Sequence, residues 1–210
     1  MMQIETFVLG IAQTNAYLVA DASSGKAVVI DPAWEGKTIQ AAAERHGWKI
    51  HQVWCTHAHF DHIGGAAALL NGLKPPSSLA LHPADLPLWR AQGGAPLFGL
   101  RLESGPEPDV ALVHGQKLQL GALEFEVRHA PGHTPGHALF YSASEGVMFC
   151  GDVIFAGSIG RTDLPGGDYA TLLHSIQTQV LSLPNETRLL SGHGEETTVG
   201  WEKRWNPFLT

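Results

Sequence analysis

The segment that most constrains this chain is His57-Ala58-His59-Phe60-Asp61-His62, which places three histidines and one aspartate within six residues. Side chains in an extended loop alternate with a period of two, so His57 and His59 can point to the same side. The chain then turns into a helix, where Asp61 and His62 can face a neighbouring position. Imidazole and carboxylate groups bind zinc, iron and manganese. The segment therefore predicts two adjacent metal ions, because a polar helix start capped by Asp61 would leave three clustered histidines unexplained.

A second histidine-bearing segment is Pro131-Gly132-His133-Thr134-Pro135-Gly136-His137. Its prolines and glycines fix an irregular backbone that can aim one imidazole, and we expect His133 to be a metal ligand. His137 opens the next predicted strand. We expect it to be packed in the protein or to support a ligand through a hydrogen bond.

Two further candidates follow predicted strands. Asp152 comes directly after the strand Val147–Cys150, where a buried carboxylate costs free energy unless it is paired or binds a metal. His193 lies between two glycines after the last strand, Arg188–Leu190. Combined with the first two segments, these residues predict one ion on His57, His59 and His133, a second ion on Asp61, His62 and His193, and Asp152 bridging the two.

The rest of the chain indicates a mixed α+β fold in which strands and helices alternate and the same order occurs in both halves. Two sheets packed face to face with helices outside would bury the strands on both sides. We expect a single domain over residues 1–210. The strands are predicted at Gln3–Leu9, Ala16–Val19, Ala27–Ile30, Ile50–Cys55, Leu79–Leu81, Leu123–His129, Ala138–Tyr141, Val147–Cys150 and Arg188–Leu190. Helices are predicted at Lys37–His46, Ile63–Leu70, Ala84–Ala91 and from Tyr169 to Val180, with Asp168 as the cap of the last and Gln92–Pro108 as a loop.

Composition excludes several classes of function. The chain has 210 residues, is 44% hydrophobic and carries a formal net charge of −7, so it offers no basic face for nucleic acid. It has no apolar stretch of the roughly 20 residues that a membrane helix needs. No positive region precedes the apolar run near its start, and we therefore expect a cytoplasmic protein. Cys55 and Cys150 are expected to be buried free thiols.

At this point the residues resemble a known family. Thr56–His62, Gly132–His137, Gly151-Asp152 and Gly192-His193 resemble the metallo-β-lactamase superfamily in order and spacing over nearly the whole chain. The run Phe155–Asp163 is similar to that of compact bacterial glyoxalase II-like proteins, the hydroxyacylglutathione hydrolases. This resemblance implies a four-layer αββα sandwich with two mixed sheets, a dinuclear site and hydrolysis of a thioester such as S-lactoylglutathione. Zinc is the favoured metal, with iron or manganese as alternatives.

Departures from the family pattern leave alternatives open. Full-length glyoxalase II has a C-terminal helical region that helps to hold glutathione, whereas only about seventeen residues follow His193 here. Metallo-β-lactamases usually have cysteine at the position of Asp152. Persulfide dioxygenases share the Gly160–Asp163 pattern and use one iron, so a mononuclear iron dioxygenase is the first alternative to a hydrolase. A non-catalytic metal-binding module is the second, and the oligomeric state stays open.

Two residues outside the ligand set have more than one interpretation. Asp31 ends a strand and can orient a ligand histidine or simply form a turn. Arg161 can bind a carboxylate of the substrate or form an ion pair with Asp163, and the ion pair is favoured. The remaining histidines, which lack convergent spacing, are expected to be ordinary surface or core residues: His46, His51, His82, His114, His129 and His174.

Overall fold

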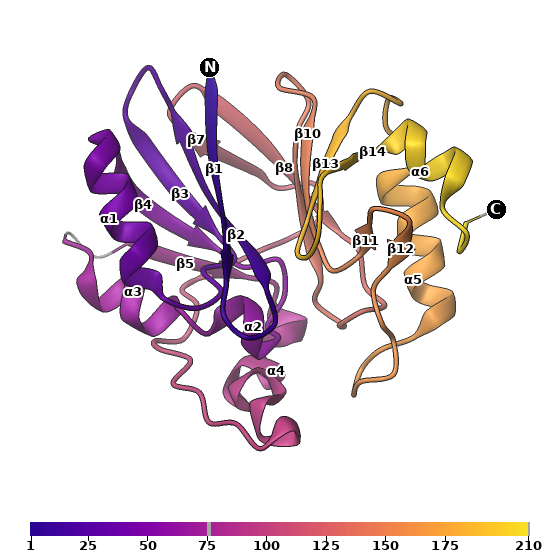
Figure 1. The fold of residues 1–210 in the computed structure, drawn as a ribbon, viewed down its shortest axis with the longest axis horizontal. Helices are drawn as coiled ribbons and strands as arrows, with labels where there is room; N and C mark the ends of the chain where they lie inside the picture. Colours follow the sequence, from indigo (N-terminus) through magenta and orange to yellow (C-terminus); the bar gives the residue numbers. More distant parts are fainter. Residues whose placement is uncertain (75–76, 210) are drawn as a thin grey trace.

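The computed structural model describes residues 1–74 and 77–209, which form four layers in the order helices, sheet, sheet, helices (Figure 1). The strands are β1 (Met2–Leu9), β2 (Thr14–Asp21), β3 (Lys26–Ile30), β4 (Lys49–Trp54), β5 (Ser78–Leu81), β6 (Val110–Ala111), β7 (Lys117–Leu120), β8 (Leu123–His129), β9 (Ala138–Ser142), β10 (Val147–Gly151), β11 (Ile154–Phe155), β12 (Ser158–Ile159), β13 (Arg188–Ser191) and β14 (Thr197–Thr198). The helices are α1 (Gly36–His46), α2 (Phe60–Ile63), α3 (Ala66–Gly72), α4 (Leu86–Arg90), α5 (Tyr169–Ser175) and α6 (Val199–Trp205), with further helical segments η1 (Pro83–Asp85), η2 (Gln92–Phe98) and η3 (Ile176–Val180).

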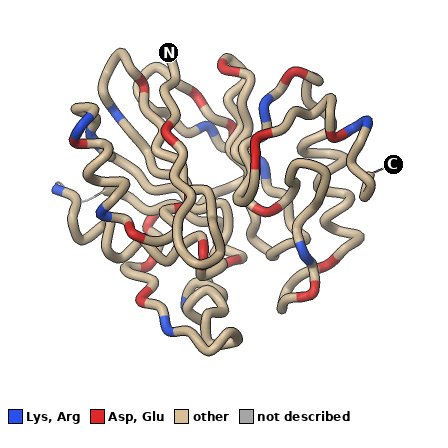
Figure 2. The backbone as a smooth tube through the Cα atoms, viewed as in Figure 1, with Lys and Arg blue, Asp and Glu red and all other residues tan. Residues whose placement is uncertain are grey.

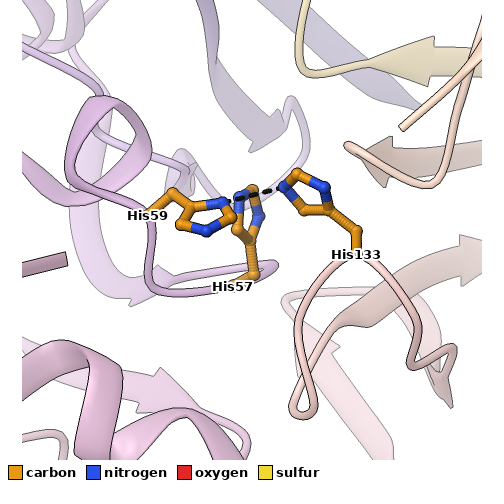
Figure 3. A group of neighbouring side chains, drawn as sticks. All are labelled: His57, His59 and His133. Carbon is orange, nitrogen blue, oxygen red and sulfur yellow. Dashed lines mark hydrogen bonds between the residues drawn. The ribbon is translucent and has the colours of Figure 1, made fainter. Parts of the chain in front are cut away.

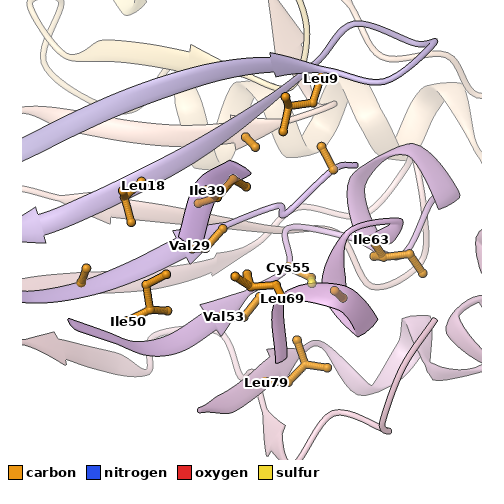
Figure 4. Close-up of a cluster of buried hydrophobic side chains, with 14 of the residues drawn as sticks. Leu9, Leu18, Val29, Ile39, Ile50, Val53, Cys55, Ile63, Leu69 and Leu79 are labelled. Atoms are coloured by element: carbon orange, nitrogen blue, oxygen red, sulfur yellow. The ribbon is translucent and has the colours of Figure 1, made fainter. Parts of the chain in front are cut away.

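The first sheet has the order β1-β2-β3-β4-β5-β6. Its first three strands are antiparallel, and β3 to β6 are parallel. One face packs against α1 and α3, where Ile39 and Leu69 join strand residues such as Leu18, Val29 and Val53 in one buried cluster (Figure 4). Small residues on α1, such as Ala42, bring the helix close to the sheet.

The second sheet has the order β14-β13-β10-β9-β8-β7. Strands β7 to β10 are antiparallel, and β10 pairs with β13 in parallel. Its outer face packs against α5 and η3 through Leu172, Ile176 and Val180. Asp168 begins α5 by accepting a hydrogen bond from the Thr171 N–H at 2.8 Å, which confirms the predicted cap.

Aromatic side chains fill the space between the two sheets. Trp54 of the first sheet packs against Phe125 and Phe140 of the second, with ring centroids 5.1 and 5.2 Å apart. Alternation along β8 buries Leu123, Phe125 and Val127, as predicted, because these residues face this core. The two sheets are therefore held at a fixed separation directly behind the loops that carry the histidines.

The structure confirms the predicted α+β sandwich and differs from the predicted elements in a few places. The helix predicted over Ile63–Leu70 is two short helices, α2 and α3, separated by Gly64 and Gly65. The chain packs closely there: the Gly65 N–H donates to the Ala33 carbonyl, and a Cβ on Gly65 would lie 2.6 Å from the Pro32 carbonyl oxygen. Strands β6, β7, β11, β12 and β14 and helix α6 were not predicted, because each is short and carries little periodic signal. The first part of the predicted loop Gln92–Pro108 forms the helical segment η2.

Cys55 and Cys150 are buried and free, as expected. Lys and Arg positions are scattered over both halves of the backbone, interspersed with Asp and Glu (Figure 2). Within residues 1–74 and 77–209, no helix combines the length and apolar character that crossing a membrane requires.

Candidate metal centre

Strand ends from the first sheet supply one half of the site. Because β3 and β4 are parallel, their carboxyl ends meet at the same edge of the sheet. Asp31 follows β3 with φ at +49°, and its N–H donates to the Trp54 carbonyl at the end of β4. The segment Thr56–His59, called the first histidine loop below, leaves β4 at this point and leads into α2.

Strand ends from the second sheet supply the other half. Pro131–His137, the second histidine loop, connects β8 to β9. Asp152 follows β10 and His193 follows β13, which is the parallel neighbour of β10. The Asn15 N–H of β2 donates to the Gly192 carbonyl at 2.7 Å, which fixes the end of the second sheet against the first.

Among the described residues, three sets of side chains could each hold an ion, and one of them, Asp31, His57 and His62, shares a member with each of the other two. His57, His59 and His133 form the set called the first ligand group below (Figure 3). One ring nitrogen from each lies within 4.8 Å of the others, and all three residues are buried. The His59 Nδ1 and His133 Nε2 atoms are 2.8 Å apart although 74 residues separate them in sequence. The ring of His133 is oriented by the Arg161 carbonyl, which accepts from Nδ1 at 2.8 Å.

Asp61, His62 and His193 form the second group, again with ligand atoms within 4.8 Å of one another. The Asp61 Oδ2 atom lies 3.3 Å from His193 Nε2 and 3.5 Å from His62 Nε2. It also accepts a hydrogen bond from the Thr14 hydroxyl at 3.0 Å, which ties the second group to the start of β2.

The carboxylate of Asp152 lies between the two groups. Its Oδ1 is 3.2 Å from His62 Nε2, and its Oδ2 is 3.6 Å from His133 Nε2 and 3.5 Å from His193 Nε2. One carboxylate therefore contacts members of both groups, as the predicted bridging role requires.

Several of the converging atoms are buried polar atoms with no hydrogen-bond partner. Among the described residues they include His57 Nε2, His62 Nε2 and Asp152 Oδ1. Burying such an atom without a partner costs free energy, and cations bound in the two groups would satisfy all three. The donor set of imidazole nitrogens and carboxylate oxygens suits zinc, iron or manganese. The residues present thus fit divalent metal ions.

The two groups have opposite electrostatic character. Burial, reinforced by the neighbouring histidines, holds the pKa of His57 well below its usual value and lowers that of His59 to about 3. Burial also disfavours the charged forms of His62 and His193, but Asp152 and Asp61 outweigh it and raise the pKa of His193 to about 9. Burial therefore keeps His57 and His59 as neutral imidazoles, which is the form that binds metal.

Asp31 follows β3 and contacts a candidate ligand. Its Oδ1 accepts from the Thr56 N–H at 2.7 Å, and its Oδ2 accepts from the Thr56 hydroxyl at 2.6 Å. The same Oδ2 accepts from His62 Nδ1 at 2.9 Å, which points the other ring nitrogen of His62 toward Asp152. Asp31 thus follows the end of β3 and hydrogen-bonds a histidine of the second group, and its role in orienting a metal ligand stays a prediction.

His137 lies directly beneath the first group. It is fully buried, its ring stacks on that of His57 with centroids 4.7 Å apart, and its Nε2 accepts from the Asp152 N–H at 3.0 Å. This nitrogen is already occupied by a hydrogen bond, so His137 supports the site by packing, in line with the expectation from sequence.

The Arg161 side chain forms a bidentate ion pair with Asp163, with both nitrogen–oxygen distances at 2.7 Å. The pair is more than half exposed, and within the site Arg161 acts through its carbonyl, which orients His133. Of the histidines without convergent spacing, His82 and His129 stack on each other with centroids 4.1 Å apart, and His46 pairs with Glu5 at 2.8 Å.

One residue beside the site was missed by the sequence analysis. Asp85, in η1, is fully buried and accepts hydrogen bonds from both histidine loops. Its sequence context, a proline-led turn after a short strand, is that of any capping aspartate. Only the fold brings it to the loops.

Comparison with known proteins gives relatives that cover the whole chain. The hydroxyacylglutathione hydrolase GloC of Haemophilus influenzae is 38% identical over 99% of this chain and 98% of its own length. The crystal structure of TTHA1623 in a di-iron-bound form superposes with a TM-score of 0.89 at 42% identity, covering 98% of this chain and all of the other. The BLEG-1 B3 metallo-beta-lactamase superposes with a TM-score of 0.91 at 36% identity, covering 99% of this chain and all of the other. The family model of the metallo-beta-lactamase superfamily matches residues 9–193, and this chain belongs to that superfamily.

Proposed function

We propose that this protein is a dinuclear metal-dependent hydrolase that cleaves a small acyl thioester of the S-lactoylglutathione type. One observation carries the proposal: seven potential ligand side chains, from segments that follow strands of both sheets, meet at one place, and Asp152 contacts both groups. The similarity to a hydroxyacylglutathione hydrolase over nearly the whole chain supports the choice of substrate class.

Bound divalent ions would supply hydroxide from water near neutral pH and would polarise the carbonyl of the substrate. The protein residues then have separate tasks. Asp61, which accepts from Thr14 and faces His193, is placed to orient the attacking oxygen through a carboxylate that stays ionised. Its pKa is lowered to about 2, because His62 and His193 outweigh the effect of burial. A thiolate leaves readily, so the site needs no strong general acid.

The test is thiol release from S-lactoylglutathione before and after metal removal by a chelator. We expect turnover to disappear in metal-free protein and to return on addition of zinc, iron or manganese, with elemental analysis on the same samples. A lactoyl thioester of a simple alkyl thiol and a β-lactam complete the panel, because a hydroxyacylglutathione hydrolase is similar to this chain in sequence and a metallo-beta-lactamase superposes on it. Unchanged thiol release by metal-free protein would overturn the proposal.

A mononuclear iron dioxygenase acting on glutathione persulfide is the second candidate. The similarity to a protein crystallised in a di-iron-bound form favours testing iron beside zinc. Oxygen uptake by iron-loaded protein with glutathione persulfide, in the absence of thioesterase activity, would replace the hydrolase with this function. Bound metal without turnover of either substrate would instead indicate the non-catalytic module.

A further inference from the structure

Asp85 is the buried carboxylate that joins the two histidine loops. Its Oδ2 accepts from the Ala58 N–H at 3.0 Å and from the Thr134 hydroxyl at 2.8 Å, and its Oδ1 accepts from the Gly136 N–H at 2.6 Å. Ala58 lies between His57 and His59 in sequence, and Thr134 directly follows His133. Each of the three residues of the first ligand group is thus next to a residue that Asp85 holds.

The second histidine loop packs closely against Asp85 at Gly136. A Cβ on Gly136 would lie 2.6 Å from the Asp85 N atom and 2.7 Å from its Oδ1, so only glycine permits this approach. Asp85 itself is fixed by η1, a turn that begins at Pro83 after β5. The two histidine loops therefore both bind the turn that follows β5 of the first sheet, in addition to contacting each other.

We propose that Asp85 is a positioning residue of the metal centre, which sets the separation of the two histidine loops and so holds His133 where it can share one ion with His57 and His59. The proposal rests on the proposed metal site but not on the identity of the substrate. It predicts that weakening the hydrogen bonds of Asp85 lowers the affinity for metal beyond what a general loss of stability of the metal-free protein would cause.

A second aspartate provides a matched control. Asp21 is also fully buried and also joins the two halves, because its Oδ2 accepts from the Ala122 N–H of the turn between β7 and β8. It accepts further hydrogen bonds from Ser23 and Ser24. Thr14 and Asp21 are the two ends of β2, and Thr14 contacts Asp61, so Asp21 lies roughly 23 Å along the strand from the centre.

The experiment compares Asp85→Asn with Asp21→Asn. Asparagine has the same shape, but its amide NH₂ must face one of the donors that the carboxylate accepts. We measure the zinc affinity of metal-free protein by competition with a chromophoric chelator, and the melting temperature of the same metal-free samples. For Asp85→Asn we expect a loss of about 10- to 100-fold in zinc affinity, as for other residues that orient ligands. For Asp21→Asn we expect a comparable fall in melting temperature and an affinity within about twofold of the unsubstituted protein.

Thr134 supplies a milder version of the same test in case Asp85→Asn does not fold. Thr134→Val keeps the shape and removes one hydrogen bond to Asp85, so zinc affinity is expected to fall by several-fold, and Thr134→Ser is expected to restore it. The proposal is overturned if Asp85→Asn and Asp21→Asn lose equal affinity, or if Thr134→Val and Thr134→Ser bind zinc equally. If the unsubstituted protein binds no metal, the proposed function fails instead.

Discussion

The two ligand groups of the candidate metal centre differ in how deeply they are buried. In the first group, His57 is fully buried and His59 and His133 are 7% and 2% exposed. In the second group, the His193 side chain is 29% exposed and that of Asp61 is 13% exposed. The first group thus lies inside the protein, whereas the second opens to solvent through His193.

The hydrogen bonds behind the ligands show the same difference. His133 is oriented by a carbonyl at 2.8 Å, and Asp85 holds the residues beside it. Among the described residues, the His193 Nδ1 atom has one hydrogen-bond partner, the Gln13 carbonyl at 3.4 Å, and the ring of Phe155 lies 6.0 Å away between centroids. We infer that the first group is preorganised for an ion, and that the second is completed by a residue whose position is less constrained and which the substrate can reach.

The largest effect is expected for His57→Ala, which removes a ligand from the first group. We expect loss of metal from the first group and a fall in kcat for thioester hydrolysis by roughly 10³-fold or more, because the hydroxide and the polarisation of the carbonyl depend on the ions. Metal content and thiol release measure both effects. His46→Ala, at the exposed C-terminal end of α1, is the matched histidine control. Retention of two ions and full activity in His57→Ala would show that this group does not bind metal.

His193→Ala tests whether the second group is the weaker one. We expect about one ion per chain to remain after desalting, and a fall in kcat of roughly 10- to 100-fold, smaller than for His57→Ala because the first group is left intact. Elemental analysis of both variants after the same desalting step makes the comparison. Loss of both ions from His193→Ala would reverse the proposed order of affinity.

Gly192→Ala sharpens the comparison without removing a ligand. A Cβ at this position would overlap Asp152 Oδ1 and lie 2.6 Å from His62 Cε1, so the second group must shift. We expect weaker binding of the second ion and a stability loss of about 1–3 kcal/mol, the usual range for overpacking. Gly194→Ala is the control: its φ of +74° makes a side chain unfavourable, but a Cβ there meets no atom within 4 Å. Equal metal content in the two variants would exclude a steric effect on the site.

The layers of the fold and the ligand segments could be predicted from sequence because their signals are local. Clustered histidines, alternation along β8 and the capping Asp168 each lie within a few neighbouring residues. Short elements such as β6, with two residues, and α6, with seven, give too few periods to stand out. The place of β6 is set by its pairing with β5, and that of α6 by contacts such as the hydrogen bond that the Thr197 hydroxyl donates to Glu202.

Asp85 shows the limit of local signals. Its three donors come from loops that are 27 to 51 residues away in the chain, and its own sequence context is ordinary. The carbonyl of Arg161 is similar, because a backbone atom that orients His133 leaves no mark on residue type. Residues that support ligands through long-range hydrogen bonds therefore require the folded structure.

The smallest expected effect concerns a histidine pair outside the candidate metal centre, His82 and His129, and its share in the loss of stability at acidic pH. Burial, followed by the nearby His129, lowers the pKa of His82 to about 4. The folded state thus favours neutral His82, whereas the unfolded state takes up a proton on this ring below pH 6.5. The free energy of unfolding therefore falls as the pH drops from 6.5 toward 4. One proton limits this slope to about 1.4 kcal/mol per pH unit, and partial exposure of His82 reduces it further.

His82→Asn removes the titrating ring and keeps an acceptor for the Ala84 N–H that His82 Nδ1 now accepts at 3.3 Å. We expect urea unfolding of metal-free protein to show a shallower loss of stability between pH 6.5 and 4 in this variant than in the unsubstituted chain. The pH dependence of stability that remains in this variant then comes from other titratable side chains, including those of the two ligand groups. Parallel curves for the two proteins would mean that the His82–His129 stack contributes nothing to acid sensitivity.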